Sequence, residues 1–435
     1  MAAGWLGDDF RARSGCDRAW HHGAAQPPRR RRGGETRVSG KRSGCQPAAR
    51  SACGTSDRDA RAFDEPDASG RRRGRGPFDG PERHRSYAVS VSRRTRSGPL
   101  TGLGSFVLAG GVALTLATCC AVLFGEISVT PREALSTLAN RLFGLDLAVD
   151  PIRDGIVWHY RLSRAVVAMC AGASLAICGV VLQALLRNPL AEPYLLGISA
   201  GASTGAVLVI VLALGAGAVT VSAGAMAGAL LAFGFVAVLS FGAGRGAERV
   251  ILAGIAGSQL FNAATSFIVT SSASAEQTRG IMFWLLGSLG GVRWPDAGLA
   301  LPVLLVGLSV CLYRARALDA FAFGEDAAAS LGVDVARVRV ELLGLTALLT
   351  ACVVSIVGAV GFVGLVIPHA TRFFVGPAHG RLILGSALAG AAFMVLADVL
   401  SRLVLPGQVL PIGVITALFG APAFAVLLWR SRGRQ

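Results

Sequence analysis

The sequence is poor in charged residues, and beyond its first hundred positions it contains long runs that have none. Charged residues make up 16% of the 435 residues and hydrophobic residues 53%, with a mean hydropathy of +0.56. Water-soluble helices are apolar on one face only, so uncharged runs of about twenty residues are typical of membrane spans. Only helices and closed barrels satisfy every backbone hydrogen bond in a bilayer. The sequence therefore predicts an all-α polytopic membrane protein.

Motifs for catalysis and metal binding are also missing. The sequence has no phosphate-binding Walker motif, no His-Glu-x-x-His and no nucleophile elbow. Its nine cysteines have no metal-binding spacing, and those in apolar runs are expected to behave as small hydrophobic residues. His369 has no second histidine at helical spacing, and His379 is expected in a loop. We therefore expect no enzyme activity, no cofactor and no metal site in this chain.

Large apolar residues are scarce in residues 1–98, which are rich in Arg, Gly, Ser and Asp. The first 100 residues hold 22 Lys and Arg against 11 Asp and Glu, within a net charge of +16 for the chain. Such a composition buries too little apolar surface to offset the entropy of chain ordering, so we predict a disordered tail. A polybasic tail could bind anionic lipid or nucleic acid. We favour a second explanation, a true start codon near Val89 or Val91, and expect no nucleic-acid partner.

Residues 99–435 are predicted to form one transmembrane domain with both termini in the cytoplasm. Inner loops and the C-terminus carry twelve arginines and outer segments carry eight, as the positive-inside rule requires. A bacterial cytoplasmic membrane is the expected location. The ten predicted spans are 103–124, 165–186, 194–214, 216–241, 250–269, 297–313, 338–358, 359–374, 382–401 and 412–429.

The most informative pattern in the sequence lies between Arg161 and Ala206. Two apolar runs flank a polar elbow at 187–193, which contains two prolines. The first run, Ala165 to Leu186, holds 22 uncharged residues, enough for a helix that crosses the ~30 Å hydrocarbon core. In the second run a glycine recurs every four residues, at Gly197, Gly201 and Gly205. This spacing predicts a helix face that a neighbouring helix can approach closely.

Several motifs in this order resemble the permease family of iron–siderophore, haem and cobalamin ABC importers, the FecCD/BtuC type. They are Arg161-Leu162-Ser163-Arg164, where Ser163 replaces the usual proline, then Gln183, Arg187 to Ala191, Leu318 to Val333, Gly361 to His369, and Ala397-Asp398 with Arg402. The resemblance covers about 103–429 and implies a type II ABC importer permease fold. It also implies cytoplasmic ATPase subunits, an external substrate-binding protein, and a homodimer or a heterodimer with a related permease.

The resemblance assigns roles to individual residues. The expected ATPase coupling segment contains Gly324, Glu325, Ala328, Ser330, Leu331 and Gly332. The expected gate and translocation path contain Asn188, Leu190, Ser271, Ser272 and Ser274. The expected docking arginines for the binding protein are Arg161, Arg164 and Arg402. From the residues alone, the coupling segment could instead be an interfacial helix on lipid, and the arginines could bind lipid phosphate.

Asp398 is the most informative charge inside a predicted span. Arg402 lies four residues later on the same helix face, so an intramembrane ion pair between them is expected. A proton-coupled carrier would also use such an acid, but it would need a midplane ion site or inverted repeats. A channel would need a filter or a charge ring. The resemblance favours import of a ferric siderophore, with haem and cobalamin as alternatives.

Overall fold

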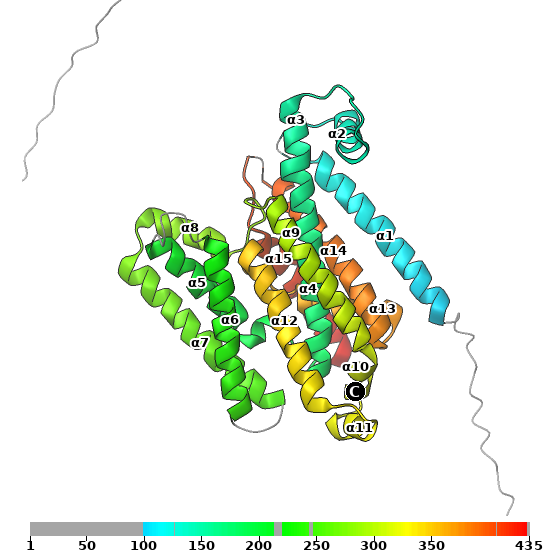
Figure 1. Ribbon diagram of the computed structural model, residues 1–435, viewed down its shortest axis with the longest axis vertical. Helices are drawn as coiled ribbons and strands as arrows, with labels where there is room; N and C mark the ends of the chain where they lie inside the picture. The colour runs from blue at the N-terminus through cyan, green and yellow to red at the C-terminus, as the bar shows by residue number, and fades with distance from the viewer. Residues whose placement is uncertain (1–98, 126, 213–219, 243–246, 406, 433–435) are drawn as a thin grey trace, which may run out of the picture. The chain divides into compact units, whose positions relative to one another are not determined.

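The computed structural model describes residues 99–432 except 126, 213–219, 243–246 and 406 (Figure 1). The predicted tail, 1–98, lies outside these residues. Within the described part the structure is built from helices, and the one β-type contact is an isolated bridge between Leu405 and Gln408. The predicted all-α membrane fold is confirmed.

Ten apolar helices correspond to the ten predicted spans. Seven described helices are long and apolar enough to cross a membrane, whereas the apolar parts of α5, α13 and α15 are shorter, at 10–17 residues. The ten helices are α1 (Pro99–Leu123), α4 (Ser163–Leu185), α5 (Ile198–Leu212), α6 (Val221–Gly242), α7 (Ala247–Ser272), α9 (Trp294–Tyr313), α12 (Val335–Val357), α13 (Val363–Val375), α14 (His379–Leu403) and α15 (Ile412–Arg432).

Helix α4 is the buried centre of one group of helices. It packs against α9, α12, α13 and α14 (Figure 1). Most of its side chains are buried. Glycines permit two of these approaches. A Cβ atom on Gly172 would lie 2.1 Å from the carbonyl oxygen of Gly390 in α14, and one on Gly179 would lie 1.9 Å from that of Gly364 in α13. Both distances are far inside van der Waals contact, so a side chain at either position would push the helices apart.

Helices α5, α6 and α7 pack together as a second group, beside α12 (Figure 1). The predicted glycine face on α5 is present at two of its three positions. A Cβ on Gly201 would lie 2.3 Å from the Gly228 carbonyl oxygen, and one on Gly205 would lie 2.0 Å from that of Gly224, both on α6. Gly197 differs, because it precedes α5 and has φ +72°, which a residue with a side chain adopts only with strain.

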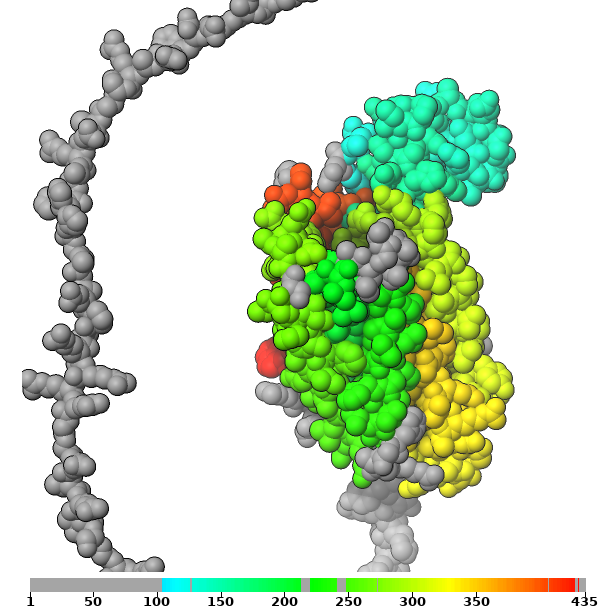
Figure 2. All heavy atoms as spheres, turned by 60° about the vertical axis from the view of Figure 1, so that its left-hand side comes forward, coloured from blue at the N-terminus to red at the C-terminus, as the bar shows by residue number. Residues whose placement is uncertain are grey.

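The segment between α1 and α4, where no span is predicted, is largely helical. It contains α2 (Pro131–Phe143), then α3 (Pro151–Gly155) and the π-helical turn η1 (Ile156–Leu162); α3 and η1 continue directly into α4. The helix therefore begins at Pro151, fourteen residues before the predicted span, with Asp150 as its N-cap. Arg153, Asp154 and His159 interrupt the apolar pattern there, which is why the predicted span begins only at Ala165. Atoms of α2 and α3 form a projection at one end of the helices (Figure 2).

Shorter elements complete the description. The 3-10 turn η2 (Pro193–Leu196) lies between α4 and α5, and α8 (Ala275–Leu285) follows α7. Helices α10 (Ala315–Phe321) and α11 (Glu325–Ser330) connect α9 to α12, at the opposite end from α2 (Figure 1).

Candidate functional site

At the α2 end of the helices, two arginines bind one buried carboxylate, and a third arginine binds the nearby end of α1. Asp398 in α14 is fully buried. Arg164 Nε in α4 lies 2.6 Å from Asp398 Oδ1, and Arg402 Nη2 lies 3.0 Å from Asp398 Oδ2. The ion pair expected between Asp398 and Arg402 therefore has a second arginine, which links α4 to α14. Removing one member of such a buried group leaves an uncompensated charge in an apolar surrounding.

Two of the arginines also bind the C-terminal end of α1. Arg161 Nη1 donates to the carbonyl oxygens of Val122 and Leu123, at 2.7 and 2.9 Å, and Arg161 Nη2 donates to that of Ile127. Arg402 Nη1 donates to the carbonyl oxygens of Ala121 and Phe124, at 3.2 and 3.0 Å. The last carbonyls of a helix have no partner within it, and they lie at the negative end of its dipole. The two guanidiniums therefore cap α1.

The three predicted docking arginines are thus brought together, but each has a partner inside the protein. Arg161 is 5% exposed, and the side chains of Arg164 and Arg402 are 12% and 7% exposed. Sequence reasoning missed the contacts with α1, since backbone carbonyl acceptors have no residue type that a pattern could reveal. Docking of a binding protein stays a prediction.

At the other end of α4, the elbow is shaped by its own side chains. Arg187 has a positive φ of 47°. Asn188 Oδ1 accepts a hydrogen bond of 2.9 Å from the backbone N–H of Leu190, and the Asn188 N–H donates to the Gln183 carbonyl at 3.2 Å. The predicted gate residue Asn188 therefore forms the turn, and Leu190 is left 45% exposed.

The elbow is also fixed to the beginning of α13. Gln183 Nε2 donates to the carbonyl oxygens of Gly364 and Leu365, at 3.3 and 3.4 Å. The Tyr194 hydroxyl donates to the Val360 carbonyl and accepts from the Val360 N–H, both at 2.6 Å. Burial raises the pKa of Glu192, which also accepts from the backbone N–H of Phe362. No sequence pattern indicated the bonds made by Tyr194 and Glu192.

The three serines of the predicted outer path have local roles. Ser274 is the N-cap of α8, where its Oγ accepts from the Gln277 N–H at 3.2 Å and Gln277 Oε1 accepts from the Ser274 N–H at 2.8 Å. Ser271 Oγ donates to the Phe267 carbonyl at 2.7 Å. Ser272 ends α7, and its side chain lies outside the described atoms. Their place in the translocation path stays a prediction.

The apolar side chains of the predicted coupling segment fall into two sets, one buried against neighbouring helices and one exposed. Leu318, Phe321 and Ala328 are fully buried and pack α10 and α11 against the neighbouring helices. Phe323 is 78% exposed and Leu331 71% exposed. Gly324 and Gly332, at φ +108° and +81°, turn the chain at the two ends of α11. Ser330 is exposed, and its Oγ donates to the Asp326 carbonyl at 2.8 Å.

An ion pair between Glu325 and Arg339 holds this segment to α12. Beside it, Glu341 of α12 binds Arg314, which precedes α10, at 2.6 Å, and Arg337 of its own helix at 3.0 Å.

His379 connects the segment to α14. Asp319 Oδ1 in α10 lies 2.7 Å from His379 Nδ1 and accepts from the His379 N–H at 2.9 Å. The expected loop position of His379 is wrong, because it is the first residue of α14 and Asp319 caps that helix. Within the described residues, no group of three or more His, Cys, Asp or Glu side chains could hold a metal ion.

The FecCD transport family matches residues 113–430 of this chain. The cobalamin import system permease protein BtuC of Halobacterium salinarum is 44% identical over 285 residues, which cover 65% of this chain and 76% of the relative. The vitamin B12 import system permease protein BtuC of Escherichia coli O9:H4 is 39% identical over 286 residues, covering 65% and 86%.

A solved structure described as a metal-chelate type ABC transporter in an inward-facing conformation has the same fold. Its TM-score is 0.65 at 30% identity, and the match covers 75% of this chain and 99% of that chain. The family match spans the arginine cluster, the elbow and the coupling segment. The chain belongs to the FecCD transport family, as a transmembrane permease subunit of an ABC importer of the FecCD/BtuC type.

Proposed function

We propose that this permease imports a corrinoid of the cobalamin class, as one half of a permease dimer between ATPase subunits and an external binding protein. The cargo proposal is supported by the similar permeases of H. salinarum and E. coli, which are named for cobalamin and vitamin B12 import. A ferric siderophore, the cargo expected from the sequence, and haem are the alternatives. Each of these cargoes brings its own metal, so none requires metal ligands on the permease.

The observation that carries the coupling role is the exposure of Phe323 and Leu331. Both project from a segment whose other large apolar side chains are buried. Exposed aromatic and aliphatic side chains beside a fixed backbone are typical anchors for a protein partner. The ATPase would bind here, at the cytoplasmic face. This orientation also puts both termini in the cytoplasm.

The coupling segment lies close to the elbow. A Cβ atom on Gly324 would lie 3.7 Å from Arg187 Nη1. Movement of α10 and α11 by the ATPase would therefore reach Arg187, and through the elbow the inner gate at Asn188 and Leu190. On the outer side, Ser271, Ser272 and Ser274 would line the path. The cargo would pass along the interface between two permease subunits, which are identical or related.

Docking of the binding protein would use the outer arginine cluster. Arg164 and Arg402 share one carboxylate and Arg161 binds only neutral backbone carbonyls, so the cluster has an excess of positive charge that suits carboxylates of a partner. Because Arg161, Arg164 and Arg402 now bind internal groups, a docking carboxylate would have to share or replace those contacts.

Uptake in a deletion strain tests the cargo. Cells that carry the permease with its own ATPase and binding protein would receive radiolabelled cyanocobalamin, ferric siderophore or haemin in separate cultures. We expect permease-dependent accumulation of cobalamin only. The control is a strain with the same permease and an ATPase that cannot hydrolyse ATP. Accumulation of the siderophore or haemin, with none of cobalamin, would contradict the corrinoid proposal and leave the permease role intact.

A further inference from the structure

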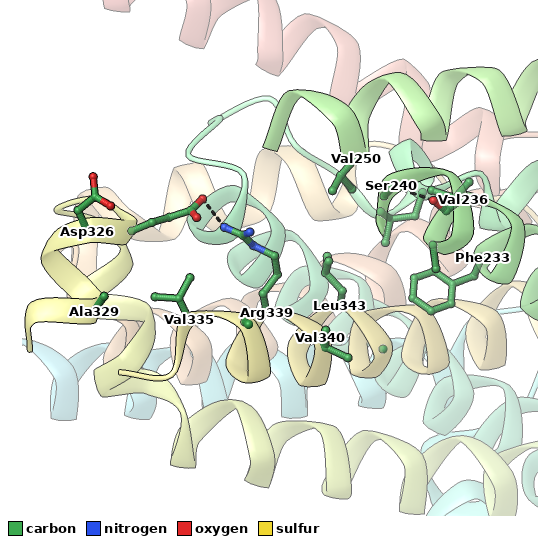
Figure 3. A pocket seen from close by; sticks show the side chains of 15 residues that line it. Phe233, Val236, Ser240, Val250, Asp326, Ala329, Val335, Arg339, Val340 and Leu343 are labelled. Atoms are coloured by element: carbon green, nitrogen blue, oxygen red, sulfur yellow. Dashed lines mark hydrogen bonds and ion pairs between the residues drawn. The ribbon is translucent and has the colours of Figure 1, made fainter. Parts of the chain in front are cut away.

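A cavity of about 770 Å³ lies between the two groups of helices, next to the coupling segment (Figure 3). Its volume is within the ~300–1,000 Å³ range of pockets that bind small molecules. Phe233, Val236 and Ala237 of α6 form one wall, and Val340, Leu343 and Gly344 of α12 form the other. These residues repeat every three or four positions, so each wall is a single helix face.

The cavity is polar at one end only. Glu325 and Asp326 of α11 lie there with Arg339 of α12, whose side chain extends away from its helix to the ion pair with Glu325 (Figure 3). Asp326 is exposed, and Val340 is 50% exposed. The lining therefore changes from charged to apolar along the helix axes.

The length of the cavity matches one leaflet of a bilayer. Its α12 wall extends from Val335, the first residue of the helix, to Gly344. Nine steps of 1.5 Å give about 13 Å, close to half of the ~30 Å hydrocarbon core. On α6 the wall ends at Ser240, two residues before the end of that helix. The cavity thus extends from the surface end of these helices to about the middle of the membrane.

We propose that this cavity binds one acyl chain of a cytoplasmic-leaflet phospholipid whose headgroup carries an ammonium as well as a phosphate. The leaflet rests on the orientation proposed above. The apolar walls match a methylene chain, whereas water is poorly held in a site with few polar partners. Two carboxylates and one guanidinium line the polar end, so an ammonium near Asp326 and a phosphate near Arg339 are both compensated. A purely anionic headgroup would meet a net negative lining.

Gly344 provides a way to fill the cavity without disturbing the helix. A Cβ atom there would meet no atom within 4 Å, and leucine is a better helix former than glycine. Gly344→Leu therefore adds volume to the α12 wall. Gly234 on α6 is equally open but does not line the cavity, so Gly234→Leu is the matched control. Ala237→Leu fills the cavity from the opposite wall.

Photolabelling tests the proposal in the assembled permease–ATPase complex. The complex would be reconstituted with phosphatidylethanolamine that carries a diazirine in one acyl chain, and labelled peptides would be identified by mass spectrometry. We expect labels on 233–240 and 336–344. Because overlap with a bound chain is costly, Gly344→Leu should reduce this labelling by about tenfold. Ala237→Leu should do the same, and Gly234→Leu should leave it unchanged.

Equal labelling of these peptides in all four proteins would overturn the site. So would a result in which other peptides of the permease carry the lipid label and 233–240 and 336–344 carry none. Phosphatidylglycerol with the same diazirine chain should label the site less, and equal labelling by both lipids would overturn the headgroup assignment. Labelling does not depend on the cargo, so a different result in the uptake experiment leaves this test unaffected.

Discussion

The two ends of this permease differ in whether their functional side chains have partners inside the protein. At the α2 end, which is the outer end in the orientation proposed above, Arg161 is buried, Arg164 and Arg402 are partly buried, and all three bind Asp398 or the carbonyls at the end of α1. At the inner end, the ion pairs of the coupling segment are partly exposed, and Phe323 and Leu331 project outward. Charges in a membrane must be paired within the protein, whereas apolar side chains at an aqueous surface can remain uncovered until a partner arrives. The charges of the outer end are therefore paired within the chain, whereas the inner end leaves large apolar side chains exposed.

The largest effect is expected from Asp398→Asn. This change leaves Arg164 and Arg402 buried without a carboxylate, and breaking a buried ion pair costs about 3–5 kcal/mol. The thermal unfolding of the purified permease would measure the loss of stability. Asp146→Asn, at an exposed position, should change the stability by less than about 0.5 kcal/mol. If Asp398→Asn had the same melting temperature as the wild type, the ion pairs of Asp398 would not be what stabilises the outer end.

A smaller effect at the same end is expected from Arg161→Ala. Hydrogen bonds to charged groups contribute about 1.5–3 kcal/mol, and this change removes the Arg161 part of the α1 cap. Without any binding protein present, amide hydrogen exchange should increase in the last turn of α1. Arg132→Ala, on the exposed surface of α2, is the control. Unchanged exchange together with weakened docking would mean that Arg161 serves the partner and not α1.

At the inner end, Phe323→Ser should weaken ATPase binding and leave the permease itself stable. Loss of an aromatic anchor at a protein interface costs about 1–2 kcal/mol, or roughly tenfold in affinity. Phe143→Ser is a close control, because Phe143 is also 78% exposed but lies on α2 at the other end. Affinity of purified ATPase for permease in nanodiscs is the measurement. Equal losses for both variants would point to a general effect of removing surface phenylalanines.

The smallest effect is expected from Glu325→Gln. Glu325 is 35% exposed in its pair with Arg339, and exposed pairs contribute about 0–1 kcal/mol. A double-mutant cycle with Arg339→Gln would measure the interaction. A coupling energy above about 3 kcal/mol would make this pair resemble the outer cluster and remove the contrast between the two ends.

Hydropathy predicted where the helices are but not which of them are buried. Gly104–Leu123 and the helix that contains α4 have nearly equal hydropathies of 2.3 and 2.4, yet 17% of the first window and 89% of the second are buried. Lipid and protein interior are both apolar, so a span facing either one has the same composition. The closely spaced glycines were the better guide, since Gly201 and Gly205 do lie against α6.

Pairing between side chains was predictable only where sequence spacing is short. Arg402 lies one helical turn from Asp398, so that pair was expected, whereas Arg164 is 234 positions away and was not. The capping of α1, the Tyr194 bonds and the His379–Asp319 contact join distant segments in the same way. Motif resemblance identified several of these residues without indicating what they touch.

The π-helical turn at Ile156–Leu162 has a consequence for how this chain tolerates insertions and deletions. A π turn contains one residue more than the α-helix around it, and each residue corresponds to about 100° of rotation. Deleting one residue from η1 would restore an ordinary helix and turn α3, with its contacts to α2, about 100° around the axis of α4. An insertion in α4 would instead rotate Arg164 away from Asp398. We expect related chains to vary in length within 156–162 more readily than within 163–185.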